Sequence, residues 1–231
     1  MRPLRQRMHA VTVFILRISG DVRSFPKLGL PVAMAILLMT ATTGIQSQIN
    51  SGYIIGLNLS TMSLKASGIN IQTKTFTAVH FGRIFEIPLT HSFALLPGLL
   101  FSAKGLNYKI DSAEFSISPI YIEIPAIAVL SFGTQLIKIS LFAGTYLACG
   151  VGGTRESGGE LKRLRFGSGE NKDMKLFDIG FNFGAGIIIK GIMISGQYEL
   201  GLANLSPAAA TYSEMKNKVI GISLAAFFSS K

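Results

Sequence analysis

Strict alternation of bulky apolar side chains with small or polar ones marks residues 177–187, FDIGFNFGAGI. In an extended backbone, alternate side chains point to opposite faces, so the bulky residues from Phe177 to Ile187 share one face. Asp178, Asn182 and three glycines occupy the other face. An α-helix would repeat apolar residues every three or four positions and would be weakened by the glycines. The pattern therefore predicts a β-strand.

Seven further stretches show a similar strand pattern. The eight predicted strands are residues 53–60, 75–88, 93–105, 116–131, 136–149, 175–189, 192–204 and 217–228. The connections at 89–92, 132–135 and 190–191 are short, whereas those at 61–74, 106–115, 150–174 and 205–216 are longer. Short and long connections thus alternate along the whole chain. This rhythm predicts an antiparallel meander with all its short turns, and both chain ends, on one side.

The composition indicates a membrane protein. Hydrophobic residues make up 48% of the chain and charged residues 15%, with a mean hydropathy of +0.45. Past the N-terminal region, however, no run approaches the roughly 20 apolar residues of a spanning helix. A closed β-barrel is the other structure that satisfies every backbone group in lipid. The sequence therefore predicts an all-β, eight-stranded antiparallel transmembrane barrel. In bacterial outer membranes, such barrels keep short turns and both termini in the periplasm.

The first 47 residues have the layout of a secretory signal peptide. Lys27 precedes the apolar run LGLPVAMAILLMTATTG, and small and polar residues follow, which suggests cleavage near Ser47. A short membrane anchor is the alternative, although the apolar run is short and contains Pro31. The predicted organisation is an N-terminal extension with a signal peptide at 1–47 and a barrel domain at 48–231.

The net charge of +10 depends partly on this N-terminal segment. Residues 1–47 hold six Lys or Arg and one Asp, which leaves 16 basic and 11 acidic residues and a net charge of +5. The remaining basic residues are dispersed and accompany no recognition motif, so no nucleic-acid partner is expected. Cys149 is the sole cysteine, which excludes a disulfide framework within the chain.

The small and polar face of the strands is predicted to line the barrel interior. A soluble barrel of the lipocalin kind would instead expose this face to water, but soluble exteriors are normally studded with charges. Eight strands leave room only for side chains inside, and buried charges persist only when they are paired. The sequence predicts a polar network that plugs the lumen, formed by Glu86, Lys104, Glu123, Lys138, Asp178, Asn182 and Glu199.

Two groups of basic residues fall outside this network. Arg83 lies in the lipid-facing phase of its strand, so it should extend towards the periplasmic head groups, unless a bulge flips the phase. Lys162, Arg163 and Arg165 form a basic cluster in the loop at 150–174, suited to lipopolysaccharide phosphates or an acidic partner. The alternative is a mobile solvated loop, because acidic residues are interspersed with the basic ones.

No motif of an enzyme is visible. His80 and His91 have no cysteine or carboxylate at ligand spacing, so we expect no metal site. No serine stands in a GxSxG motif, and GVGGT at 150–154 is not followed by the lysine of a phosphate-binding loop. We therefore expect no cofactor and no enzymatic activity.

The chain resembles the porin-like outer-membrane β-barrel domain family of Bacteroidota, which includes PorT-type proteins. The resemblance covers about residues 52–228 and rests on eight phrases that occur in order: GLNLST, FEIPLT, LLPGLLFSAKG, YIEIP, LFAGTYL, FDIGFNFGAG, QYELGLANL and KNKVIGISL. It implies an eight-stranded barrel in the outer membrane, in a family whose members mostly have no assigned activity. The chain departs from the family pattern at Gly98, Thr145 and Val129, which makes the lumen less charged.

Three functions remain open on the sequence. The first is an integral outer-membrane barrel of structural or interaction type, with a plugged lumen and a possible place in an envelope or secretion assembly. The second is a porin-like channel for small solutes, and the third is a soluble periplasmic lipid carrier. The partners expected for the first are outer-membrane lipid and lipopolysaccharide, the barrel-assembly machinery during insertion, and other envelope proteins.

Overall fold

The structure is a computed structural model that describes residues 49–66, 68–110, 113–134, 136–157, 159–169, 171–207 and 212–228. Within these ranges, the regular secondary structure consists of β-strands. In the same ranges, no helix has the length and apolar character needed to cross a membrane. The predicted signal peptide at 1–47 lies outside the described residues and stays a prediction.

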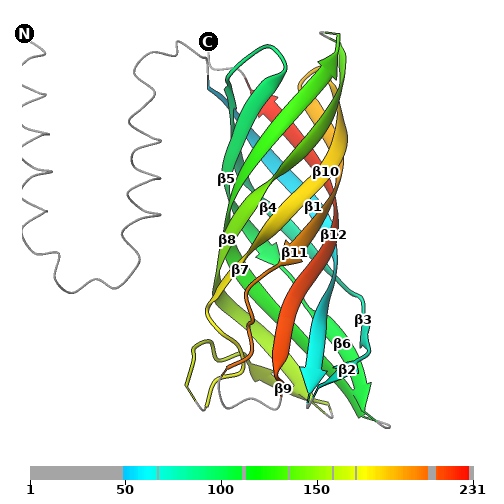
Figure 1. Cartoon of the computed structure of the whole chain (residues 1–231), viewed down its shortest axis with the longest axis vertical. Coiled ribbons are helices and arrows are strands. Elements are labelled where there is room, and N and C mark those ends of the chain that lie inside the picture. Colours follow the sequence, from blue (N-terminus) through cyan, green and yellow to red (C-terminus); the bar gives the residue numbers. More distant parts are fainter. Residues whose placement is uncertain are drawn as a thin grey trace, which may run out of the picture. The chain divides into compact units, whose positions relative to one another are not determined.

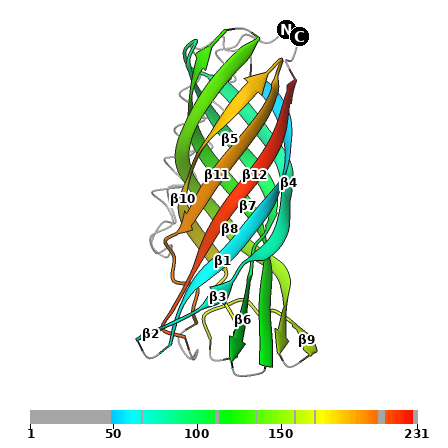
Figure 2. The same ribbon diagram turned by 90° about the vertical axis from the view of Figure 1, so that its right-hand side faces the viewer.

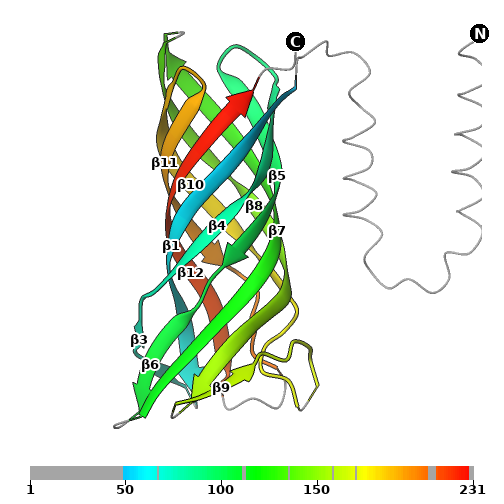
Figure 3. The same ribbon diagram turned by 180° about the vertical axis from the view of Figure 1, so that it is seen from behind.

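Eight long strands form a closed ring (Figure 1). They are β1 (Asn50–Ala66), β4 (Phe76–Pro88), β5 (Phe93–Ala103), β7 (Ala113–Gly133), β8 (Ile137–Ser157), β10 (Phe177–Ile189), β11 (Ile192–Gly201) and β12 (Glu214–Phe228). Each pairs antiparallel with the next in chain order. The last strand, β12, pairs with β1 over its whole length and closes the ring (Figure 3). The predicted eight-stranded antiparallel barrel is confirmed.

All the long connections emerge at one end of the barrel, which we call the loop end, and all the short turns at the other, the turn end (Figure 2). The described chain starts at the turn end in β1 and leaves it in β12, where Ser51 pairs with Phe228. The turn between β10 and β11 consists of Lys190 and Gly191, both at positive φ. Two such residues make the type of tight turn that matches the twist of paired strands.

The loop end extends further than the sequence pattern predicts. Strand β7 begins at Ala113 and β8 ends at Ser157, whereas the pattern places these ends near 116 and 149. Four short strands flank this extension: β2 (Ile69–Ile71), β3 (Thr73–Lys74), β6 (Leu106–Ile110) and β9 (Glu160–Arg163). The added segments pair through their backbones but lack regular apolar alternation, because they lie beyond the apolar part of the wall.

The outer wall carries the bulky apolar side chains, as the alternation predicts. Exposed examples occur on every long strand: Ile55, Leu57, Phe81, Leu99, Ile124, Ile139, Leu141, Ile179, Phe181, Ile194, Ile220 and Ile222. Along β10, exposed residues alternate with buried or half-buried ones from Phe177 to Ile189. A broad exposed apolar surface of this kind is typical of a barrel embedded in lipid.

Arg83 lies on this outer wall, close to the turn end. Its guanidinium carbon is 5.8 Å from the ring centre of Tyr53 and 5.2 Å from that of Phe85. The pairing of β1 with β4 continues without a register shift from Asn50 to Ser60, so no bulge at this pair turns Arg83 inward. Contact with the faces of two aromatic rings stabilises a cation at this level of the wall.

Glycines on the inner face of β10 make room for aromatic rings on β8. Gly180 pairs with Tyr146 and Gly184 with Phe142. A Cβ atom added to Gly180 would lie 2.7 Å from Tyr146 Cε1, and one added to Gly184 would lie 2.6 Å from Phe142 Cζ. Both distances are shorter than two carbon atoms tolerate. The glycines in the FDIGFNFGAG stretch therefore leave the space that these two rings occupy.

Three layers of side chains fill the interior. The loop-end cluster is apolar and contains Met62, Leu64, Leu106, Tyr108, Tyr121, Tyr146, Ala148, Met174, Leu205 and Met215. The turn-end cluster is also apolar and contains Ile84, Leu100, Ile127, Val129, Phe142, Met193 and Ala225. Between them lies a polar layer, as the inward sequence Tyr121, Glu123, Ile127 along β7 illustrates. The interior therefore holds two apolar clusters besides the polar side chains that the alternation predicts.

Replacing Gly184 with valine should destabilise the barrel, because the added side chain would overlap the backbone oxygen of Gly196 and the ring of Phe142. We expect a loss of about 1–3 kcal/mol, which is typical of overpacking. It is measured as the shift in the urea midpoint for unfolding in detergent. The matched control is Gly196→Ala, because a Cβ added there meets nothing within 4 Å. Equal losses in the two variants would contradict the pairing of glycines with rings.

Candidate functional site

The ammonium group of Lys104 lies at the centre of the polar layer. Lys104 follows the end of β5, and its Nζ lies 2.7 Å from Glu123 Oε2 on β7 and 2.8 Å from Glu199 Oε2 on β11. All three side chains are almost completely buried. Because β7 and β11 are not neighbours in the ring, this double ion pair crosses the lumen. We call these groups and their hydrogen-bond partners the charged layer.

Aromatic rings close the loop-end side of Lys104. Its Nζ lies 4.1 Å from the ring centre of Tyr146 and 5.8 Å from that of Tyr121. Both rings belong to the loop-end cluster. A desolvated ammonium gains from such contacts, which add to its two ion pairs. Carboxylates therefore bind this cation on two sides, and aromatic rings contact it on its loop-end side.

Four hydrogen bonds to carboxylates extend the charged layer. Asp178 Oδ2 accepts hydrogen bonds from Tyr146 Oη at 3.1 Å and Asn217 Nδ2 at 2.8 Å. Glu199 Oε1 accepts bonds from Asn182 Nδ2 and Gln197 Nε2, both at 3.2 Å. Amide and hydroxyl donors of this kind stabilise a carboxylate in a medium of low dielectric constant.

His80 belongs to the same level of the interior. Its Nδ1 lies 2.8 Å from Asn58 Oδ1, and its Nε2 lies 2.9 Å from Ser223 Oγ. The amide oxygen can only accept, so Nδ1 donates to it, whereas the serine hydroxyl can donate to Nε2 or accept from it. His80 is thus a hydrogen-bonded structural residue that links β4 to β1 and β12.

Five of the seven predicted lumen residues come together in the charged layer. They are Lys104, Glu123, Asp178, Asn182 and Glu199. The structure does not place Glu86 and Lys138 in this network. Both share its inward phase, but they lie near the turn end of their strands, and each residue of a strand advances about 3.3 Å.

Glu86 and Lys138 line a separate cavity of about 500 Å³ at the turn end. Glu86 Oε2 accepts a hydrogen bond from Asn50 Nδ2 at 2.8 Å. His91 also lines this cavity and is exposed. Among the described residues, no three His, Cys, Asp or Glu side chains are placed to hold a metal ion.

Sequence reasoning missed several members of the charged layer. Tyr146, Gln197 and Asn217 donate to its carboxylates, and Asn58 and Ser223 bind His80. The inward phase of each residue was readable from the alternation. Which inward residues meet across the lumen depends on the stagger of the strands around the ring, and alternation carries no information on that stagger.

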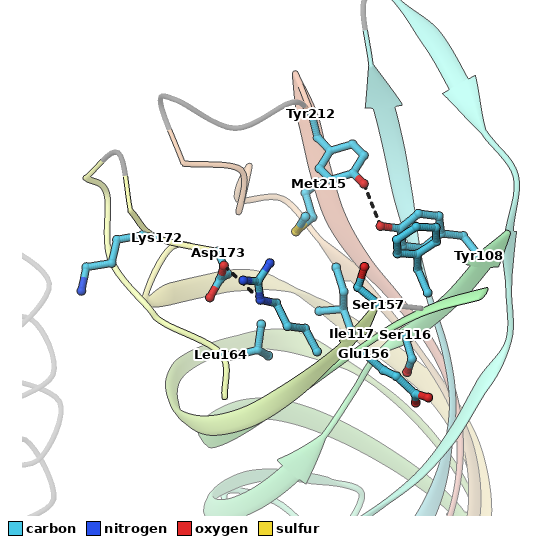
Figure 4. Close-up of a pocket in the computed structure, with 12 residues that line it drawn as sticks. Tyr108, Ser116, Ile117, Glu156, Ser157, Leu164, Lys172, Asp173, Tyr212 and Met215 are labelled. Atoms are coloured by element: carbon cyan, nitrogen blue, oxygen red, sulfur yellow. Dashed lines mark hydrogen bonds and ion pairs between the residues drawn. The ribbon is translucent and has the colours of Figure 1, made fainter. Parts of the chain in front are cut away.

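A second cavity, of about 280 Å³, opens at the loop end (Figure 4). On one side, the hydroxyls of Tyr108 and Tyr212 are 2.8 Å apart, and the ring of Tyr108 stacks on Phe115. Burial, and secondly the bond to Tyr212, raise the pKa of Tyr108 well above its usual value, so it stays protonated. On the other side, Asp173 Oδ1 lies 3.5 Å from Arg155 Nε. Arg155 and Asp173, two of the charged residues that line this mouth, are thus already paired with each other.

The predicted basic cluster does not act as one unit. Lys162 Nζ lies 2.9 Å from Glu160, and Arg165 Nε lies 3.4 Å from Asp173. Arg163 forms no ion pair with any residue in the described ranges. Alternation along β9 also places Lys162 and Arg163 on opposite faces. Lys162 pairs with Arg155, which points inward, and Arg163 pairs with Thr154, which points outward.

The apolar outer wall, the closed ring and the filled interior define an integral membrane β-barrel. The chain belongs to the family described as "Outer membrane protein beta-barrel domain", whose match covers residues 43–206. It is therefore an outer-membrane barrel protein. A comparison with curated proteins found no match.

Several solved barrels are similar in structure. Ail, the attachment invasion locus protein of Yersinia pestis, solved with the heparin analogue sucrose octasulfate, is 12% identical with a TM-score of 0.41; the similarity covers 78% of this chain and 99% of Ail. Neisserial surface protein A is 12% identical with a TM-score of 0.41 and coverages of 77% and 97%. The N-terminal barrel of Pseudomonas aeruginosa OprF is 13% identical with a TM-score of 0.36 and coverages of 79% and 100%.

Replacing Lys104 with methionine should destabilise the barrel strongly, because Glu123 and Glu199 then face each other without a cation. We expect a loss of about 3–5 kcal/mol, the usual cost of breaking a buried ion pair from one side. The measurement is unfolding in urea, followed by the gel shift between folded and unfolded barrel. Adding Glu123→Gln and Glu199→Gln should recover most of the loss. No recovery would show that Lys104 acts by packing and not by charge.

Proposed function

We propose that this protein is a closed, non-conducting barrel of the outer membrane that presents its loop end to other components of the cell envelope. The observation that carries the proposal is the charged layer, with Lys104 bound to carboxylates from opposite parts of the ring. Apolar clusters lie on both sides of it. An ion crossing the lumen would have to displace both clusters and break both ion pairs, at a high cost in free energy.

The proposed orientation puts the loop end outside the cell and the two chain ends in the periplasm. Its support is the division between three short turns and four long connections, which follows the usual asymmetry of bacterial barrels. A signal peptide at 1–47 and a barrel domain at 48–231 belong to the same proposal. Insertion would then depend on the barrel-assembly machinery.

We also propose that the chain is a PorT-type member of the Bacteroidota barrels, because the eight phrases quoted above occur in family order. Its partners would be outer-membrane lipid, lipopolysaccharide and other envelope proteins that contact the loop end. The exposed apolar wall argues against a soluble lipid carrier. Catalysis and cofactors have no part in the proposal.

Purified protein in planar bilayers should give no steady ion-sized openings. The filled interior is the reason, and a conducting porin added to the same bilayers provides the positive control. Insertion of the protein is verified by flotation of vesicles that carry it. Reproducible single-channel steps from the inserted protein would contradict the closed lumen and favour a channel for small solutes.

Cysteine labelling on intact cells tests the orientation. In a Cys149→Ser background, Leu161→Cys on β9 should react with a membrane-impermeant maleimide, because Leu161 is 66% exposed at the loop end. His91→Cys in a turn of the opposite end should react only after the outer membrane is broken. The reverse pattern of labelling would overturn the orientation.

A further inference from the structure

A depression of about 650 Å³ interrupts the outer wall near the loop end, where β4, β5, β7, β8 and β9 meet. Register places Ala103, Gly152 and Thr154 on the outward face, because Ala103 and Gly152 each pair with the exposed Ile120, and Thr154 pairs with Ser118 two residues along β7. At these positions the bulky apolar side chains of the wall are replaced by small ones. The small residues are Thr77, Ala103, Ser118, Gly152 and Thr154.

The chemistry of the depression changes along the barrel axis. Its edge nearest the barrel middle consists of Val79, Ile120 and Val151, which are exposed apolar residues continuous with the lipid-facing wall. One step towards the loop end, the hydroxyls of Ser118 and Thr154 lie 2.9 Å apart. The wall of the depression therefore changes from apolar at Ile120 to hydroxyl-bearing at Ser118, two residues further along β7.

The guanidinium group of Arg163 lies at the level of these two hydroxyls. Arg163 lines the depression and pairs in register with Thr154, so it lies on the outward face. It forms no ion pair within the described part of the chain, whereas Lys162 pairs with Glu160 and Arg165 with Asp173. Of the three residues in the predicted basic cluster, Arg163 is the one whose charge has no ion pair among the described residues.

We propose that this depression binds the phosphorylated sugar head group of an outer-leaflet glycolipid of the lipopolysaccharide class. Arg163 binds a phosphate, the hydroxyls of Ser118 and Thr154 contact the sugar, and an acyl chain follows Val79, Ile120 and Val151. The apolar edge, the two hydroxyls and the guanidinium offer partners for the acyl chain, the sugar and the phosphate, and the charge of Arg163 complements the phosphate. The choice of this lipid rests on the orientation proposed above, because glycolipid occupies the outer leaflet.

Binding of purified lipid A tests the proposal. The intact protein is extracted from outer membranes, exchanged in detergent until no glycolipid remains, and titrated with bisphosphorylated lipid A by native mass spectrometry. Arg163→Gln should weaken binding about tenfold, the loss expected for one charge-assisted contact. Lys162→Gln, which removes a paired charge from the same strand, should leave affinity unchanged.

Dephosphorylated lipid A separates phosphate recognition from apolar contact. It should bind the unaltered protein as weakly as bisphosphorylated lipid A binds Arg163→Gln, and that variant should not distinguish the two lipids. Equal affinities of Arg163→Gln and Lys162→Gln for bisphosphorylated lipid A would overturn the site. So would a preference for phosphate that persists in Arg163→Gln.

A second pair of variants tests the depression itself. Gly152→Leu fills it, and a Cβ at Gly152 meets nothing within 4 Å, so the barrel should fold normally. Gly196→Leu is the matched control, because Gly196 has the same open space on β11, away from the depression. Loss of lipid A binding in the first variant alone supports the site, and equal binding by both overturns it. These titrations in detergent do not depend on how the barrel is oriented in the membrane. If cysteine labelling contradicted the proposed orientation, it would overturn only the assignment of the bound lipid to the outer leaflet.

Discussion

The ion pairs of one ammonium with two carboxylates organise the interior of this barrel. Lys104 reaches Glu123 on β7 and Glu199 on β11, two strands that backbone hydrogen bonds do not join. A buried charge is tolerated only when it is paired and its remaining polar atoms are hydrogen-bonded. Asn182 and Gln197 donate such bonds to Glu199, and Tyr146 and Asn217 donate them to Asp178 in the same layer. This demand links residues from β8, β10, β11 and β12 to a single point on the barrel axis.

The loop-end and turn-end clusters lie on either side of the Lys104 ammonium group and exclude water from it. Aliphatic and aromatic side chains fill these clusters, and glycines on β10 face the rings of Tyr146 and Phe142. A dry interior strengthens the attraction of Lys104 for its carboxylates, while the ion pairs hold the strands at the separation that the rings need. The closed lumen and the charged layer are thus mutually dependent.

Alternation along the strands was enough to predict the ring, its lipid-facing residues and the inward phase of the charged residues. It could not show that Glu86 and Lys138 lie in a separate cavity, because the level of a residue in the lumen depends on the stagger between strands. Nor could it show that Lys162 and Arg165 form ion pairs while Arg163 forms none among the residues that the structure describes. Those pairs depend on how β8 and β9 form a ribbon beyond the wall, in a segment without apolar periodicity.

The most direct measurement of the central claim is the exchange of ammonium protons with water, followed by ¹⁵N NMR on the protein in lipid nanodiscs. The account predicts one ammonium signal that exchanges slowly and disappears in the methionine variant of Lys104, because this group is shielded on all sides by carboxylates, rings and apolar layers. If every lysine ammonium exchanges rapidly at neutral pH, water reaches Lys104, and the interior is open rather than closed.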